Sequence, residues 1–256
     1  MKNLLLYSLS CFLLSNVSNA QTRKVTDERT GVEIIFIAEN GMFPYNWYSG
    51  DINCKAISLD SSEIVRSTEI IKKALSKYPV DVIKKNLDKV YVLKSLEFYG
   101  VAYGGTNAKN KVYIANSGII ANYTNDFIER LFHAEFSSVL LANYPDTFDK
   151  KHWVGANDKH FNYSCENGYE ALKSGNASEE FNEVYNEKGF LDEYSISTLD
   201  NDINAFAKNM FMAKPNFWRV VAQNNKLSMK LELVVNFYHK IDKTFTLDYF
   251  KKISAN

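Results

Sequence analysis

The segment FIERLFHAEFSSVLL, residues 127–141, is the most informative part of this sequence. Thr124-Asn125-Asp126 precedes it, and Pro145 lies just beyond Asn143. Polar residues of this kind cap helix N-termini, and proline is common shortly after a helix C-terminus. The sequence therefore predicts a helix from about Phe127 to Asn143. The run Lys111–Ala115 predicts a strand before this helix.

Toward the N-terminus the pattern is rich in strands. Ser61-Ser62-Glu63 opens a predicted helix that extends to Tyr78, and a second short helix covers about Val80 to Leu87. Gly104–Asn107 and Lys109–Asn110 are turn residues, so the sequence predicts turns at both places. The predicted strands are Val32–Ile37, Val90–Leu93, Glu97–Tyr103 and Lys111–Ala115.

Beyond Asn143 the sequence is mostly helical. The predicted helical segments lie near 179–188, 199–213, 215–222 and 226–241, and aromatic-rich loops join them. A strand-rich first half that meets a helical second half indicates an α+β fold.

Three segments together resemble the zincin metallopeptidases, and more closely a group of zinc-binding peptidases exported by Bacteroidetes-type bacteria. They are Tyr99–Thr106, Phe132–Ser138 and Leu199–Asn204, within a resemblance that extends from about Tyr78 to Asp242. The resemblance implies a zincin-like α+β fold with a strand-rich N-terminal lobe, an active-site-type helix and a mainly helical C-terminal lobe.

The zincin register assigns residues on the helix. In that family two histidines at positions i and i+4 hold zinc, and the glutamate after the first histidine is the general base. This register places Glu135 as the base and Ala134 and Ser138 at the two ligand positions. Alanine has no donor atom, and a neutral hydroxyl is a poor zinc ligand. The sequence therefore predicts a degenerate site, with no cofactor expected.

His133 is the histidine next to this motif. One residue along a helix is about 100° of rotation, so His133 faces away from the direction of position 134. Its i−4 neighbour is Glu129, and such a pair holds a metal weakly or is an ordinary helix contact. His133 is retained as a metal candidate that applies only if zinc is bound.

Acidic residues and a tyrosine downstream complete the candidate site. The resemblance implies an acidic third ligand near Asp200 and Asp202, and a tyrosine at Tyr194 that steadies an oxyanion. Acidic residues here also fit a helix N-terminus, where they interact with the helix dipole, so both interpretations stay open.

The predicted function is that of a metallopeptidase-like pseudoenzyme that binds a peptide or protein partner in its cleft. Zincins bind substrates as an extended strand along an edge strand, which we expect near Lys111–Ala115. One alternative is an active zinc metallopeptidase with ligands drawn from His133, Glu135, Asp200 and Asp202. Another is a structural or interaction component of an exported assembly.

Residues 1–20 have the order of a secretory signal peptide. Lys2 precedes an apolar run from Leu4 to Leu14, and Ser18 and Ala20 fit the −3 and −1 positions of a cleavage site. The run is shorter than the roughly 20 residues that span a bilayer. We expect a secreted or periplasmic protein whose mature part, residues 21–256, is one zincin-like metallopeptidase-family domain.

The net charge bears on the class of binding partner, and the cysteine content bears on disulfide bonding. The formal net charge is zero, which argues against nucleic acid or an anionic membrane as partner. The mature chain keeps Cys54 and Cys165. In an oxidising compartment a lone pair most simply forms a disulfide, and two separated buried thiols are the alternative.

Overall fold

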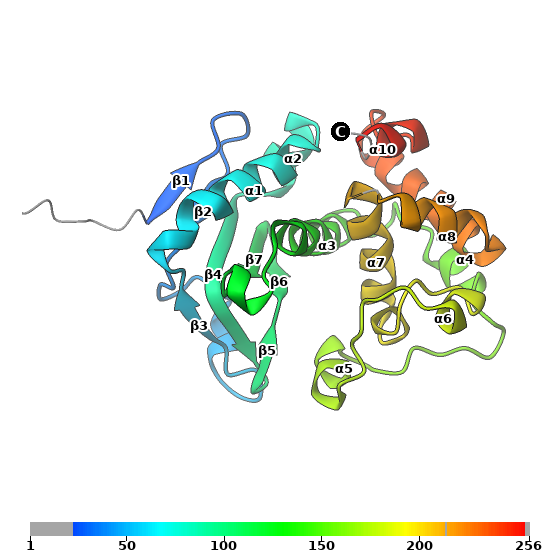
Figure 1. Ribbon diagram of the computed structural model, residues 1–256, viewed down its shortest axis with the longest axis horizontal. Helices are drawn as coiled ribbons and strands as arrows, with labels where there is room; N and C mark the ends of the chain where they lie inside the picture. The colour runs from blue at the N-terminus through cyan, green and yellow to red at the C-terminus, as the bar shows by residue number, and fades with distance from the viewer. Residues whose placement is uncertain (1–22, 213, 254–256) are drawn as a thin grey trace, which may run out of the picture.

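The computed structural model describes residues 23–212 and 214–253. They form a mixed α/β structure in which a seven-stranded sheet packs against helices. Figure 1 shows the sheet on one side, most helices on the other, and α3 (Asn125–Asn143) between them. The predicted signal peptide at residues 1–20 lies outside the described residues.

The sheet is organised around its longest strand, β4 (Lys89–Phe98). The strand order is β1-β2-β4-β7-β6, with β3 and β5 paired to β4. Strand β4 runs parallel to β2 and β7, and antiparallel to β3 and β5. The other strands are β1 (Lys24–Thr26), β2 (Glu33–Ile35), β3 (Lys55–Ser58), β5 (Val101–Tyr103), β6 (Gly105–Ala108) and β7 (Lys111–Ala115).

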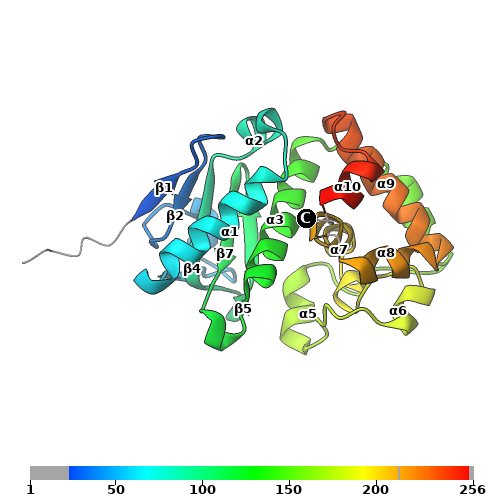
Figure 2. The same ribbon diagram turned by 45° about the horizontal axis from the view of Figure 1, so that its top comes forward.

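Helices cover one face of the sheet and form the rest of the described chain. Helices α1 (Ile64–Ser76) and α3 lie on the same face, and α7 (Leu199–Met212) packs on α3 (Figure 2). None of the helices in the described ranges is long and apolar enough to cross a membrane. The remaining α-helices are α2 (Val80–Asn86), α4 (Lys150–Gly155), α5 (Gly168–Ser174), α6 (Glu183–Glu187), α8 (Pro215–Ala222), α9 (Asn225–Ile241) and α10 (Leu247–Ile253).

Successive apolar side chains of β4 belong alternately to two hydrophobic cores. Val90 and Val92 belong to the large core that includes α1, α3, α7 and α9, whereas Tyr91 and Leu93 belong to a second core on the opposite face. Successive side chains of a strand point to opposite faces, so an uninterrupted apolar run serves both cores. The loop around Phe43 covers the second core.

The prediction of a turn at Gly104–Asn107 was wrong. Residues 105–108 form β6, which pairs antiparallel with β7. One turn lies before β5, where Tyr99 and Gly100 have φ of 56° and 73°, and the other follows β6 at the predicted Lys109–Asn110, where Lys109 has φ of 52°. Glycine and asparagine favour turns locally, but pairing with a neighbouring strand overrides that preference.

The position of β6 also corrects the expected substrate strand. Strand β7 pairs with β4 on one side and β6 on the other, so its backbone groups are already paired. The edge strand next to α3 is β6. The prediction of an open edge at Lys111–Ala115 is therefore wrong.

The predicted Cys54–Cys165 disulfide is absent, and both described cysteines are free thiols. Cys54 is buried in the second core, on the sheet face opposite α3. The backbone N–H of Cys165 donates to the Ser197 carbonyl, which holds it beside the start of α7. The two thiols are fixed by different parts of the fold and do not meet.

Candidate functional site

Helix α3 presents one face to the core and another to a cleft. The Thr124 side chain accepts a hydrogen bond from the Phe127 backbone N–H at 3.2 Å, which confirms the predicted cap. Phe132 and Phe136 are fully buried, one turn apart. Residues 134, 135 and 138 lie about 60° to 160° around the helix from Phe132 and Phe136 and line the cleft.

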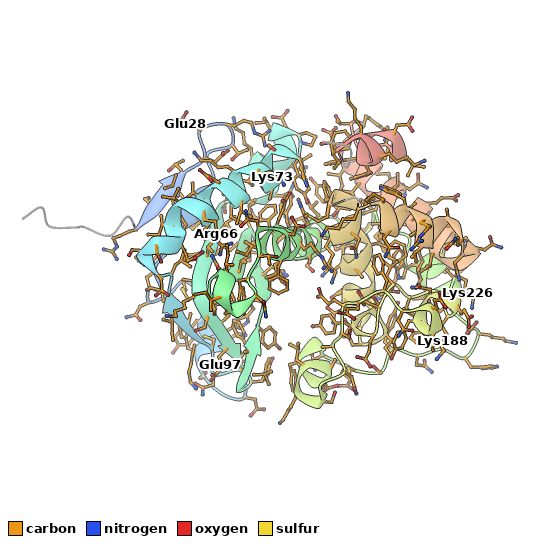
Figure 3. The ribbon with its side chains drawn as sticks, viewed as in Figure 1. Glu28, Arg66, Lys73, Glu97, Lys188 and Lys226 are labelled. Carbon is orange, nitrogen blue, oxygen red and sulfur yellow. The ribbon has the colours of Figure 1, made fainter. Side chains whose placement is uncertain are left out.

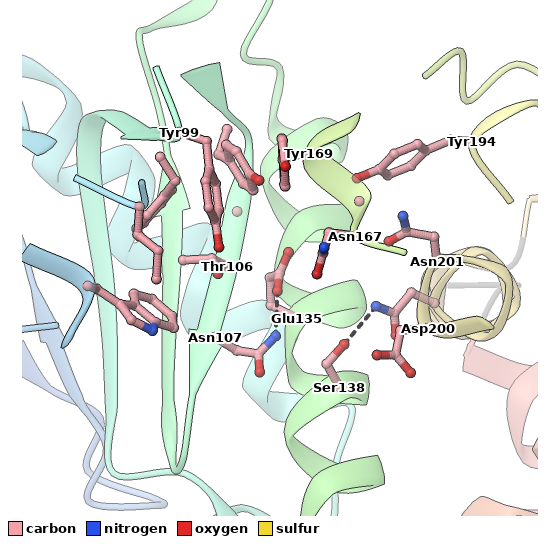
Figure 4. A pocket seen from close by; sticks show the side chains of 17 residues that line it. Tyr99, Thr106, Asn107, Glu135, Ser138, Asn167, Tyr169, Tyr194, Asp200 and Asn201 are labelled. Carbon is pink, nitrogen blue, oxygen red and sulfur yellow. Dashed lines mark hydrogen bonds between the residues drawn. The ribbon is translucent and has the colours of Figure 1, made fainter. Parts of the chain in front are cut away.

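The cleft separates the sheet edge from α7. It consists of two adjoining hollows of about 290 Å³ and about 520 Å³. Figure 4 shows the first, with Thr106 and Asn107 of β6 on one side, Glu135 in the middle and Asn201 of α7 on the other. Residues that line both hollows are Tyr103, Gly105, Glu135, Tyr194, Asn201 and Asn204.

Glu135 lies against the edge strand. Its Oε2 accepts a hydrogen bond from Asn107 Nδ2 at 2.8 Å. A Cβ added at Gly105 would lie 2.9 Å from Glu135 Cγ, so this strand position accommodates only glycine without displacement. Burial raises the pKa of the Glu135 carboxyl to about 7, against the opposing effects of the Asn107 hydrogen bond and the Lys208 charge.

Ser138 contacts α7 across the cleft. Its Oγ accepts a hydrogen bond from Asn204 Nδ2 at 2.7 Å (Figure 4). Sequence reasoning missed Asn204, although it lies one helical turn after Asp200 and therefore on the same face of α7. The residue of α7 that faces position 138 is thus a neutral amide.

His133 points away from the cleft. It is fully buried, and its Nδ1 shares a hydrogen bond of 2.8 Å with the Tyr78 hydroxyl. Burial lowers the pKa of the imidazole to about 4, so it is neutral at physiological pH. Glu129, the i−4 neighbour, is held by Lys73 of α1, which Figure 3 labels, and by Lys77 just beyond the end of α1. His133 and Glu129 therefore join α3 to the core.

The two acidic candidates on α7 lie in different environments. Asp200 and Tyr194 line the same hollow as Glu135. Asp202 is fully buried elsewhere, where its Oδ2 accepts hydrogen bonds from Lys230 at 2.7 Å and Trp153 at 2.9 Å. Two residues along a helix turn about 200°, so the side chains of Asp200 and Asp202 diverge. The structure brings together Glu135, Tyr194 and Asp200, and not His133 or Asp202.

Comparison with known proteins agrees with this architecture. A crystal structure from Bacteroides caccae, described as a "putative zinc-binding metallo-peptidase", superposes with a TM-score of 0.57. The match covers 89% of this chain and 85% of that chain at 15% sequence identity. The chain has a metallopeptidase-like fold. No family model and no curated protein matches the sequence.

The residues on this metallopeptidase-like fold do not fit a zinc ion. Position 134 offers no donor atom, and the hydroxyl at 138 already accepts a hydrogen bond from Asn204. Within the described residues, no three His, Cys, Asp or Glu side chains are grouped so that they could hold a metal. The alternative ligand set, which included His133 and Asp202, is distributed over separate environments.

Aromatic side chains, which sequence reasoning did not assign to the site, close one end of the cleft. Tyr99, at the turn between β4 and β5, stacks on Tyr169 of α5 with ring centroids 4.3 Å apart and an interplanar angle of 14°. Tyr103 and Trp47 line the same hollow. The sequence signals were the abundance of aromatic residues, at 14%, and the presence of Tyr99 and Tyr103 in a segment that carries the resemblance.

Proposed function

We propose that this is an exported metallopeptidase-like protein that has lost zinc catalysis and binds a peptide or protein partner in its cleft. The observation that carries the proposal is the Ser138–Asn204 hydrogen bond beside Ala134. The zincin register puts metal ligands at 134 and 138, but here the helix keeps only Glu135 of the motif.

The edge strand supports peptide binding. Strand β6 pairs with β7 on one side, and its residues Gly105, Thr106 and Asn107 line the cleft on the other. An extended peptide can add to a sheet edge through main-chain hydrogen bonds, with side chains entering adjacent pockets. Loss of zinc leaves this edge intact, so binding can persist without hydrolysis.

Metal analysis tests the loss of catalysis. Protein purified without chelators or metal-affinity resin is expected to contain far less than one equivalent of zinc by mass spectrometry. One equivalent that survives dialysis, together with hydrolysis of an unstructured protein substrate, would instead establish the active-enzyme alternative.

Cleft occupancy is tested with a blocking variant. A displayed library of random ten-residue peptides is selected on the protein, and the enriched peptides are measured on Thr106→Trp, which places an indole in the cleft. We expect binding to weaken at least about tenfold, because the side chain occupies the peptide's place. Thr244→Trp, in an exposed loop far along the chain, is the matched control and should bind normally. Equal binding by all three would favour an interaction surface elsewhere.

Export is tested by intact mass. The mature protein recovered from the periplasm or medium should begin at Gln21, because Ser18 and Ala20 match the cleavage pattern. A mass that includes residues 1–20 would contradict the proposed export.

A further inference from the structure

The smaller hollow of the cleft has an unusual lining. Of its 17 lining residues, none is Lys, Arg or His, and two are carboxylic acids, Glu135 and Asp200. Most of the other walls are aromatic or carry neutral amides. The six aromatic residues are Trp47, Phe98, Tyr99, Tyr103, Tyr169 and Tyr194.

The cations that act on the two acids lie outside this hollow: Lys208 acts on Glu135, and Lys150 acts on Asp200. The two cations of the adjoining hollow are already paired. Lys208 Nζ lies 2.7 Å from Glu179 Oε1, and Arg130 lies 3.3 Å from the other oxygen of the same carboxylate. Neither cation forms an ion pair with Glu135 among the described residues. The Glu135 carboxyl has one hydrogen bond, from Asn107, to Oε2, and Oε1 accepts none from the described part of the chain.

The acidic and aromatic lining of this hollow favours a positively charged ligand. An anion entering the hollow would meet two acids and no cation among the residues that line it. A cation would gain a carboxylate partner and the negative faces of aromatic rings, which attract ammonium and guanidinium groups. The interaction is strengthened because the hollow is partly shielded from water.

We propose that the hollow is a subsite for a lysine or arginine side chain of the bound peptide, with Glu135 as its counter-ion. The inference rests on the proposed peptide-binding function. Figure 4 shows how the geometry serves it, because the Glu135 carboxyl points into the hollow between Thr106 of β6 and Asn201 of α7. A peptide lying along β6 directs alternate side chains toward this carboxyl.

Matched probes separate the charge from the shape of the ligand. Two ten-residue peptide libraries differ only at the central position, which is lysine in one and uncharged norleucine in the other. Two blocked amino acids, Nα-acetyl-lysine methylamide and its norleucine analogue, probe the subsite alone. The variants are Glu135→Gln, which can still accept the Asn107 hydrogen bond, and Glu232→Gln, a control on an exposed position of α9.

At pH 8, above the pKa of about 7 of the Glu135 carboxyl, we expect peptides from the lysine library to bind the wild type and Glu232→Gln at least about tenfold more tightly than their norleucine counterparts. In Glu135→Gln the ratio of the two affinities, lysine peptide to norleucine peptide, should fall close to one. A neutral oligosaccharide, which aromatic and amide walls could also accept, should not compete with the lysine peptides.

The outcomes distinguish this inference from the function on which it rests. Peptides that bind without preference for lysine would overturn the subsite and leave peptide binding standing. Acetyl-lysine methylamide binding without any peptide binding would support the subsite and count against the peptide function. A preference for lysine that persists in Glu135→Gln, or binding of the oligosaccharide alone, would overturn the subsite.

Discussion

The Ser138 hydroxyl on α3 accepts a hydrogen bond from Asn204 on α7 at 2.7 Å. This contact joins the two helices at the position where the zincin register requires a metal ligand. The contact is a neutral hydroxyl–amide pair, and a hydrogen bond of this kind typically contributes about 1 kcal/mol to stability. The contact also identifies Asn204 as the residue of α7 to change if a metal site is to be built here.

The first prediction is that a zinc site can be rebuilt here. Ala134→His with Ser138→His supplies two imidazoles one helical turn apart, and Asn204→Asp adds a carboxylate opposite position 138. The triple variant should bind about one equivalent of zinc, because three protein ligands suffice. The double variant retains Asp200 in the cleft and should bind more weakly, and each single histidine variant weaker still.

Competition with a fluorescent zinc chelator measures these affinities. Circular dichroism confirms that each variant is folded. A folded triple variant with no gain over the double variant would show that position 204 does not converge with 134 and 138.

The second prediction concerns the pH dependence of stability. Burial raises the pKa of the Glu135 carboxyl in the folded protein to about 7, from an ordinary value of 4.5. Ionising it in the folded state is therefore unfavourable, and the cost grows as pH rises from 4.5 to 7. Glu135→Gln should be more stable than the wild type at pH 8, by about 1 to 3 kcal/mol, and nearly equal to it at pH 4.5.

Urea unfolding at the two pH values measures this difference. Glu232→Gln is the control and should show no such trend. A stability difference that is independent of pH would contradict the raised pKa of Glu135.

The third prediction concerns the buried ion pair of the helical region. Lys230 and Asp202 are both fully buried, with Nζ and Oδ2 2.7 Å apart. Lys230→Met leaves the Asp202 carboxylate unpaired and should destabilise the protein by about 3 to 5 kcal/mol. The double variant with Asp202→Asn should recover much of that loss, because no isolated charge remains. A double variant as unstable as the single one would argue against charge as the cause.

The fourth prediction replaces the expected disulfide with two thiols of different reactivity. Cys165 is partly exposed, whereas Cys54 is buried and its thiol pKa is raised by burial. An aromatic disulfide reagent should titrate one thiol in the native, unreduced protein and two in guanidinium chloride. Cys165→Ser should remove the fast reaction. No reactive thiol in denaturant would mean that the two sulfurs are bonded after all.

Local signals predicted much of the helical structure. The Thr124 cap and the apolar spacing defined α3, and similar patterns predicted α1, α2, α8 and α9 to within a few residues. The short helices α4, α5 and α10 were not predicted, because they are too short to show a clear apolar period.

Residue identity and helical spacing are local properties, so the sequence alone predicted a helix that carries Glu135 between positions 134 and 138, neither of which has a usual zinc ligand. The three-dimensional structure was needed to identify Gly105–Ala108 as the edge strand and Asn204 as the partner of Ser138. It also separated Asp202 from the cleft and gathered distant aromatic rings into its wall. These features depend on contacts between residues far apart in the chain, which short-range patterns do not encode.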